Sequence, residues 1–224
     1  QMELREAPVP VPGLGEVLLK VNACAVCGTD LRILGGGKTR GVYPPRVLGH
    51  EIAAHIVSFG EGAEAAVGLP IGQRVVFPPG ITCGACRFCV IGMENHCKRR
   101  EAFGYKYDGG FAEYMVVPAH AARRGILMAI PDTLADAEAS LAEPLACVVN
   151  GQRQSQVGVG DVVVVAGAGP IGLMHVQMSR LAGARAIIVS EPSTARREQA
   201  MAIDRKSTRL NSSHEWISRM PASA

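Results

Sequence analysis

The sequence predicts an α/β protein, in which a mostly β domain is followed by the beginning of a doubly wound parallel sheet. Three observations indicate this fold class. Residues 1–120 are rich in glycine, proline and short runs of β-branched and apolar residues, which are typical of strands bounded by turns. Residues 131–154 have a helical pattern. Residues 161–192 read as strand, glycine-rich turn, helix and strand, which is one βαβ unit.

Four segments of the first part fit strands, because each is apolar or β-branched and ends near glycine or proline. The helical segment begins after Pro131, and Asp132 is the expected N-cap because its side chain can accept a backbone hydrogen bond. No internal repeat interrupts this order. The expected strands are residues 16–27, 51–60, 73–80 and 111–118.

The bulk composition excludes several classes of protein. A formal net charge of +3 over 224 residues is small, which argues against nucleic acid as a partner. The longest apolar run, residues 161–174, is too short and too glycine-rich to cross a bilayer. Clustered Cys-x-x-Cys spacing favours metal binding in a reducing compartment, and no secretory leader is visible. We therefore expect a cytoplasmic protein without a membrane partner.

The C-terminal stretch, residues 204–224, differs in character from the rest of the chain. It has no apolar periodicity, it contains the only tryptophan, Trp216, and it follows a helix-like run without a cap. Its first part, DRKSTRLNSSH, is similar to the translation of a common short-read sequencing adapter. We expect residues 204–224 to be a disordered read-through artefact. A natural disordered tail is the alternative.

Four of the seven cysteines lie in one short stretch with the spacing C-x2-C-x2-C-x7-C. Four thiolates can close a tetrahedral shell around zinc, and a closed shell is structural rather than catalytic. Iron–sulfur ferredoxins share the first three cysteines, but their fourth follows after three residues and precedes proline. Disulfides or inert thiols are the remaining alternative. The sequence predicts a structural zinc site at Cys83, Cys86, Cys89 and Cys97.

A second set of candidate ligands is spread before and after this cysteine lobe. Taken singly, each residue is weak evidence, because isolated cysteines and acidic residues are common. Their order around the lobe, and ahead of a glycine-rich turn, makes the set informative. The candidates are Cys27, Thr29, Asp30, His50, Glu51 and Glu143.

A G-x-G-x-x-G pattern follows a run of four valines and precedes a helix. In that context its glycines allow a tight turn, and the backbone approaches a pyrophosphate at the helix N-terminus. The sequence therefore predicts a dinucleotide site at Gly167, Gly169, Pro170, Ile171 and Gly172.

The residue that would read the ribose lies further along the second strand. Glu191 comes nineteen residues after Gly172, where a carboxylate accepts hydrogen bonds from the ribose 2′-OH and repels a 2′-phosphate. This favours NAD. Arg196 and Arg197 keep NADP open as an alternative.

The motifs together resemble those of the zinc-dependent medium-chain dehydrogenases. GHE at residues 49–51, the four-cysteine lobe, GGFAEY and GAGPIG stand in the order of that family, over residues 3–203. The resemblance implies an irregular GroES-like β-barrel catalytic domain over residues 1–148. It also implies the N-terminal part of a Rossmann NAD-binding domain over residues 149–203.

The resemblance also assigns roles to the second set of residues. Cys27 and His50 match ligands of a catalytic zinc ion with one open position, which activates the substrate hydroxyl. In the sorbitol and threonine dehydrogenase branch, acidic residues at the positions of Glu51 and Glu143 complete the set. Which of the two binds zinc directly is left open. Thr29 matches the hydroxyl of the proton relay, and Asp30 the carboxylate that orients the zinc-bound histidine.

The expected function follows from the resemblance. It is zinc-dependent oxidation of a secondary alcohol, a polyol or sugar alcohol, with hydride transfer to NAD and two zinc ions per complete chain. Oxidation of an amino alcohol such as threonine, or a non-catalytic zinc-binding module, are the alternatives. Relatives are commonly oligomeric, so a homo-oligomer is expected for the full-length protein.

Two further expectations concern completeness and substrate choice. A doubly wound nucleotide domain needs about six strands, and the sequence predicts only two, so we expect the chain as given to be inactive. Substrate identity is expected in loops such as residues 41–43 and 104–109, for which spacing gives no rule. Residues 35–38, GGGK, lack the spacing of a phosphate-binding loop and are expected to be a plain flexible loop.

Overall fold

The computed structural model describes residues 2–203 and 208–211. The chain divides into two compact units, Gln1–Glu143 and Pro144–Ala224. Helix α6 (Ala142–Ser155) contains this division, and it also contains residue 148, where the sequence placed the domain limit. No helix among the described residues is long and apolar enough to cross a membrane.

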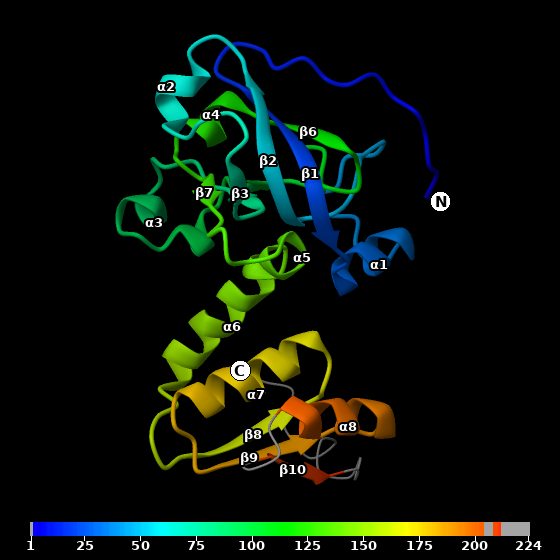
Figure 1. The fold of residues 1–224 in the computed structure, drawn as a ribbon, viewed down its shortest axis with the longest axis vertical. Helices are drawn as coiled ribbons and strands as arrows, with labels where there is room; N and C mark the ends of the chain where they lie inside the picture. The colour runs from blue at the N-terminus through cyan, green and yellow to red at the C-terminus, as the bar shows by residue number, and fades with distance from the viewer. Residues whose placement is uncertain (1, 204–207, 212–224) are drawn as a thin grey trace. The chain divides into compact units, whose positions relative to one another are not determined.

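The first unit is built on one mostly antiparallel sheet. Strand β1 (Val17–Ala25) pairs with β2 (Glu51–Phe59), so that Val17 faces Phe59 and Ala25 faces Glu51. Figure 1 shows this long pair at the centre of the unit. The strand order is β6–β1–β2–β3–β7, which is an open sheet among the described strands rather than the expected barrel. The other strands of this sheet are β3 (Arg74–Val76) and the two edge strands β6 (Tyr114–Val117) and β7 (Met128–Ala129).

The open sheet follows from the lengths of the strands. β1 and β2 have nine residues each, whereas β7 has two, so little backbone remains at that edge for further pairing. The core below the sheet is nevertheless dense, with Leu19, Ile56 and Phe103 fully buried. Each such side chain contributes about 1.5–3 kcal/mol relative to exposure. This core fixes the strand ends on which the candidate ligands lie.

Short elements complete the first unit. The cysteine lobe lies between strands β4 (Gly80–Ile81) and β5 (Glu101–Ala102), which pair with each other in a separate two-stranded sheet. It contains one-turn helix α3 (Arg87–Val90) and the 3₁₀ turn η1 (Glu94–His96). The other helices of this unit are α1 (Gly28–Leu34), α2 (Ala63–Val67), α4 (Ala119–Ala122) and α5 (Asp136–Ala139).

The predicted helix over residues 131–154 is two helices, and its predicted start is wrong. α5 begins at Asp136 with Ala135 as N-cap, not at Asp132. The Arg74 guanidinium donates to the Leu134 carbonyl and to the Asp136 carboxylate, which holds residues 131–135 in a turn. Pro144 has no N–H to bond the carbonyl four residues earlier, and this favours the break between α5 and α6.

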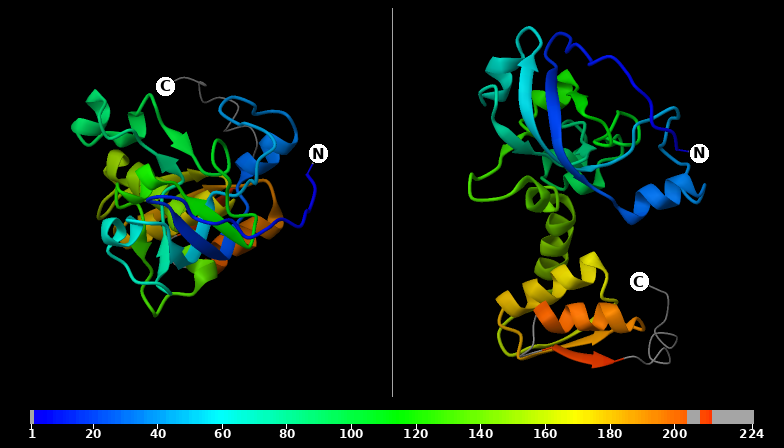
Figure 2. Two further views of the ribbon diagram at one scale, coloured as in Figure 1. Left: turned by 90° about the horizontal axis from the view of Figure 1, so that it is seen from above. Right: turned by 45° about the vertical axis from the view of Figure 1, so that its right-hand side comes forward.

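The second unit is a parallel α/β arrangement. Strand β8 (Val162–Ala166) leads through α7 (Pro170–Leu181) to β9 (Ala186–Ser190). Helix α8 (Thr194–Ile203) then leads to β10 (Thr208–Asn211), which pairs in parallel with β9. Figures 1 and 2 show α7 and α8 on the same face of this sheet. The mixed α/β fold class predicted from the sequence is confirmed.

Strand β10 lies inside the stretch for which the sequence predicted disorder. Four of those residues, 208–211, are a strand, and the remainder of residues 204–224 lies outside the described part of the chain. The outer edge of β9 offers unpaired backbone N–H and C=O groups. An extended segment that follows α8 can satisfy them whatever its side chains, so apolar periodicity gave no signal for this strand.

Candidate metal centres and nucleotide-binding turn

The antiparallel register of β1 and β2 brings together residues that are far apart in the sequence. Ala25, at the end of β1, faces Glu51, at the start of β2. Cys27 follows β1 by two residues, and His50 immediately precedes β2. The side chains of Cys27, His50 and Glu51 therefore meet, and one ligand atom from each lies within 4.8 Å of the other two. His50 and Glu51 are each only 6% exposed.

Asp30 supports two members of this group. Its Oδ2 accepts the backbone N–H of Cys27 at 3.0 Å, which fixes the first turn of α1. Its Oδ1 lies 3.4 Å from Nδ1 of His50, and neither of these two buried atoms has a hydrogen-bond partner among the described residues. A carboxylate behind Nδ1 leaves Nε2 of His50 for a metal, the arrangement that orients metal-bound histidines.

Thr29 lies on the same turn. Its backbone N–H donates to Sγ of Cys27 at 3.5 Å, and its side chain is half-buried. A backbone N–H directed at sulfur favours the thiolate, which is the form that binds metal. The sequence predicted Thr29 and Asp30 as neighbours of the metal, and the structure places both beside Cys27.

The two glutamates differ in their distance from the group. Glu51 belongs to it, whereas Glu143 is outside the set of atoms within 4.8 Å. Burial raises the pKa of Glu51, and the Cys27 side chain lowers it in part. Burial also raises the pKa of Glu143, while the nearby charge of His50 lowers it and that of Glu51 raises it. Carboxylates this close together favour a bound cation, because a cation compensates their mutual repulsion.

The four lobe cysteines form a second group. Their sulfur atoms lie within 4.8 Å of one another, and Cys89 and Cys97 are 8% exposed. The Cys86–Cys89 and Cys83–Cys89 sulfurs are 3.5 Å and 3.9 Å apart, well beyond a disulfide bond of about 2 Å. Four sulfur donors and no open position fit a structural zinc ion.

Backbone groups prepare the lobe for a metal. A hydrogen bond from the Ala85 backbone N–H is the main cause that lowers the pKa of Cys83 to about 6, and one from the Cys89 backbone N–H lowers the pKa of Cys86. Burial raises the pKa of Cys89 to about 11. These backbone hydrogen bonds favour the thiolates of Cys83 and Cys86, and a metal would displace the remaining protons.

A polar network ties the lobe to the body of the unit. The Thr82 hydroxyl donates to Oε2 of Glu94 at 2.8 Å, and Arg124 donates to Oε1 of the same carboxylate at 2.5 Å. The Cys83 sulfur raises the pKa of the Arg99 guanidinium, a cation that partly offsets the thiolate charge. The lobe is therefore held by these groups and by its own sulfurs rather than by an apolar core.

The glycine-rich turn joins β8 to α7. Gly167 has φ +97°, a conformation that favours glycine, and Gly169 is the N-cap with Pro170 at the first helical position. A Cβ on Gly172 would lie 2.0 Å from the Gly167 carbonyl oxygen, so only glycine lets the helix pack this closely. A Cβ on Gly169 would meet nothing within 4 Å. These are the roles that a dinucleotide turn requires.

Glu191 braces this turn. Its carboxylate accepts the backbone N–H of Ala168 and that of Ser193, each at 2.8 Å. The Ala168 bond is the main reason that the pKa of Glu191 is lowered. Arg197 donates to the backbone carbonyls of Glu191 and Pro192, whereas Arg196 is exposed.

An open groove of about 710 Å³ lies in the second unit. It is lined by β8, by the glycine-rich turn with Ile171, and by His175 and Gln152. The Gln152 side chain donates to Nδ1 of His175 and to the Ser179 hydroxyl, which fixes the imidazole at the groove wall. Four of the five predicted cofactor residues of the turn thus border this open space: Gly167, Gly169, Ile171 and Gly172.

Sequence reasoning missed one pair of residues near the first metal group. Lys38, in the stretch expected to be a plain loop, donates to the Tyr105 hydroxyl at 3.1 Å. The Tyr105 ring in turn packs against His50, with centroids 5.8 Å apart. No sequence signal joins residues 38 and 105, because their contact depends on how two loops fold back on the sheet.

Fold and donor groups together are those of a zinc-binding dehydrogenase. A family model described as the alcohol dehydrogenase GroES-like domain matches residues 13–132, which is more than half of the chain. The chain belongs to the zinc-dependent medium-chain dehydrogenase/reductase family. This confirms the family that the sequence motifs resemble.

Known relatives are oxidoreductases of this family. L-threonine 3-dehydrogenase of Pyrococcus horikoshii is 40% identical over 200 residues, covering 88% of this chain and 55% of that protein. L-galactonate-5-dehydrogenase of Escherichia coli K12 is 37% identical over 194 residues, covering 87% and 54%. A structure described as a zinc-binding dehydrogenase of Sinorhizobium meliloti 1021 bound to NADP has a TM-score of 0.84 and 35% identity, covering 98% and 61%. The chain spans about half the length of the curated relatives it matches.

Proposed function

We propose that this protein oxidises a secondary alcohol, a polyol or sugar alcohol, and transfers the hydride to NAD. The observation that carries the proposal is the meeting of Cys27, His50 and Glu51, with Asp30 behind the imidazole. Three protein donors leave one position of a tetrahedral zinc ion for substrate. When bound there, zinc supplies a Lewis acid that lowers the pKa of a coordinated hydroxyl, and NAD supplies the hydride acceptor.

The chain's own residues would position these groups and move the proton. Asp30 Oδ1, which lies 3.4 Å from Nδ1, would hold His50 in the tautomer that leaves Nε2 for zinc, and Asp30 Oδ2 also accepts the Cys27 backbone N–H. The Thr29 hydroxyl, on the same turn, would accept the alcohol proton and pass it towards solvent. Glu51 would be the third ligand because it belongs to the close group. Glu143 would exchange with it or act through water.

The preference for NAD rests on Glu191. A carboxylate at the end of β9 disfavours a 2′-phosphate by charge, and Arg197 is engaged with backbone carbonyls. Exposed Arg196 is the residue that would serve NADP instead. The two zinc sites, the homo-oligomer and the division at residue 148 belong to the same proposal for the complete protein.

Two other functions are distinguishable by experiment. Oxidation of threonine or a similar amino alcohol is supported by the identity with the Pyrococcus enzyme. A non-catalytic zinc-binding module would keep the cysteine lobe but would have no use for an open metal position. Whether an added alcohol binds at the Cys27–His50–Glu51 group distinguishes this module from both enzymes.

The test is cobalt substitution of the 224-residue chain. Cobalt at an open Cys–His–Glu site has visible absorption bands that respond to an added alcohol, whereas cobalt in a closed four-sulfur site does not. We expect sorbitol to shift the bands of the wild type and to leave those of Cys27→Ser unchanged. Cys147→Ser, which alters a cysteine of neither group, is the matched control. Bands that respond to L-threonine but not to sorbitol favour the amino-alcohol alternative, and bands insensitive to both contradict catalysis.

A further inference from the structure

A lysine stands beside the candidate catalytic group without a carboxylate partner. The ammonium of Lys38 lies 4.5 Å from the centre of the Tyr105 ring and 3.1 Å from its hydroxyl oxygen. Among the described residues, no ion pair involves Lys38. Its side chain is half-buried. The Tyr105 ring and hydroxyl partly compensate this charge.

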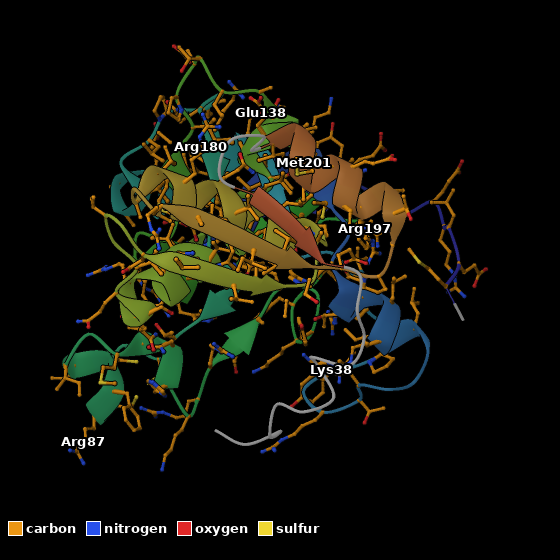
Figure 3. All side chains as sticks on the ribbon, turned by 90° about the horizontal axis from the view of Figure 1, so that it is seen from below. Lys38, Arg87, Glu138, Arg180, Arg197 and Met201 are labelled. Carbon is orange, nitrogen blue, oxygen red and sulfur yellow. The ribbon has the colours of Figure 1, made fainter. Side chains whose placement is uncertain are left out.

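Backbone hydrogen bonds hold the loop that carries Lys38 to α1 and to the segment that carries Tyr105. The Lys38 backbone N–H donates to the Arg32 carbonyl at the end of α1. Further along the loop, the Tyr43 N–H donates to the Tyr105 carbonyl at 3.1 Å. Figure 3 shows Lys38 on the loop that follows α1. A lysine on an anchored loop forms a site more readily than one on a free loop, because less freedom is lost on binding.

Tyr105 connects the ammonium to the metal group. Its ring packs against the His50 ring, with centroids 5.8 Å apart and planes tilted by 54°. Tyr105 thus contacts both Lys38 and the candidate zinc ligand His50. One of its three N–H donors is used on the Tyr105 hydroxyl, which leaves two for another acceptor.

Neighbouring charges do not neutralise Lys38. Asp108, three residues after Tyr105 in the sequence, pairs with Arg46 at 3.0 Å. Asp30 and Glu51 bring two acidic side chains to the metal site. An anionic ligand would be repelled there unless a fixed cation compensates it.

We infer that Lys38, held by Tyr105, selects alcohols that carry an anionic group, a carboxylate or a phosphate, close to the hydroxyl that reacts. The ammonium donates two charge-assisted hydrogen bonds to that group while the hydroxyl binds at the metal. This inference rests on the proposed function, which it narrows from polyols in general to their acids or phosphate esters. Lys38 is on this view a residue that determines specificity, and it takes no part in proton or hydride transfer.

The test compares three ligands with one carbon skeleton: galactitol, L-galactonate and galactitol 1-phosphate. Their affinities are measured by titrating the metal-loaded chain, with the cobalt bands as the readout. In the wild type we expect an anionic ligand to bind about tenfold or more tightly than galactitol, in line with a hydrogen bond to a charged group. The ligand with the larger advantage shows whether carboxylate or phosphate is the natural group.

Lys38→Gln should abolish this advantage and leave the affinity for galactitol unchanged, and Lys38→Arg should retain it. Arg40→Gln, which removes an exposed cation from the same loop, is the matched control and should behave as wild type. Unchanged cobalt bands without ligand show that each variant keeps its metal site. The inference is overturned if the wild type binds all three alike, if Lys38→Gln keeps the advantage, or if it weakens all three equally. If no alcohol binds the wild type, the proposed function falls with it.

Discussion

At the scale of single residues, the candidate site depends on buried polar groups with few partners. Asp30 is 1% exposed, and its two oxygens serve Cys27 and His50. Within the described part of the chain, one of these oxygens has no hydrogen-bond partner, and the facing Nδ1 of His50 has none either. Burial of polar groups without hydrogen bonds costs free energy. A metal ion on Nε2 would leave the ring proton on Nδ1, where it faces the Asp30 carboxylate.

Asp30→Asn is therefore expected to weaken the first metal site selectively. The amide keeps the volume but loses the charge behind His50, and supporting groups of this kind contribute about 10–100-fold to metal affinity. Zinc competition with a chelator should show one weakened ion per chain and one unchanged ion. Asp132→Asn, at an exposed turn, is the control. Equal weakening of both ions, or of neither, would contradict the role given to Asp30.

Two glycines of the nucleotide turn provide a matched pair of variants for a test of stability. Gly172→Ala places a methyl group 2.0 Å from the Gly167 carbonyl oxygen and should destabilise the second unit by about 1–3 kcal/mol. Gly169→Ala adds a methyl group that meets nothing within 4 Å, so it should leave stability close to wild type. Urea unfolding of the three proteins measures the difference. Similar midpoints for both variants would show that the turn relaxes around Gly172.

At the scale of elements, Glu191 joins β9 to the turn after β8. Its lowered pKa means that the ionised carboxylate stabilises the fold through the Ala168 and Ser193 N–H groups. This contribution is fully present above the ordinary glutamate pKa of about 4.3 and is lost as pH falls through the lower folded value. Stability of the second unit should therefore fall on acidification below about pH 4.3. Glu191→Gln should flatten this part of the pH–stability curve, and an unchanged curve would argue against the brace.

We expect the cysteine lobe to be held in its conformation by the four cysteines that would bind zinc. Between β4 and β5 it has only one-turn structures, and Lys98, Arg99 and Arg100 are exposed there. Cys97→Ser removes one of four donors and should lower lobe zinc occupancy and speed tryptic cleavage at these basic residues. The β1–β2 sheet should keep its melting temperature, because the apolar core that stabilises it does not include the lobe cysteines. Cleavage at the wild-type rate would mean that the lobe is ordered without its metal.

At the scale of the whole molecule, the relevant question is how much of a nucleotide domain the chain provides. Three parallel strands are described, in the order β10–β9–β8, and β8 has an open edge beside the 710 Å³ groove. A doubly wound dinucleotide domain uses about six strands, with the cofactor across the point where strand order reverses.

We therefore predict that the 224-residue chain binds two zinc ions but does not turn over alcohol with NAD. Metal analysis after dialysis, together with NADH absorbance in the presence of sorbitol, measures both quantities. The same assay on Cys27→Ser should report one zinc ion per chain. Turnover within the ordinary enzyme range, about 1–10³ per second, would show that these strands suffice for the cofactor.

Much of the chemistry could be predicted before the fold was known. The lobe cysteines lie within fifteen consecutive residues, and the glycine turn within six, so local spacing alone nearly fixes their geometry. Helix limits were less predictable. The Arg74 side chain, which is remote in sequence, holds the turn before α5, and no local pattern at Asp132 reports that contact. β10 was not predicted because strands pair through backbone groups, and no side-chain pattern indicated this strand.

The sequence by itself determined which groups are available: five thiols, an imidazole and carboxylates for two candidate metal sites, and a glycine turn for a dinucleotide. Only the tertiary structure decided which of them meet. The register of β1 on β2 sets Cys27 beside His50 and Glu51 and leaves Glu143 outside the closest group. Two folded loops set Lys38 against Tyr105. These contacts join residues far apart in the chain, so they depend on burial of a common core, which short-range spacing does not encode.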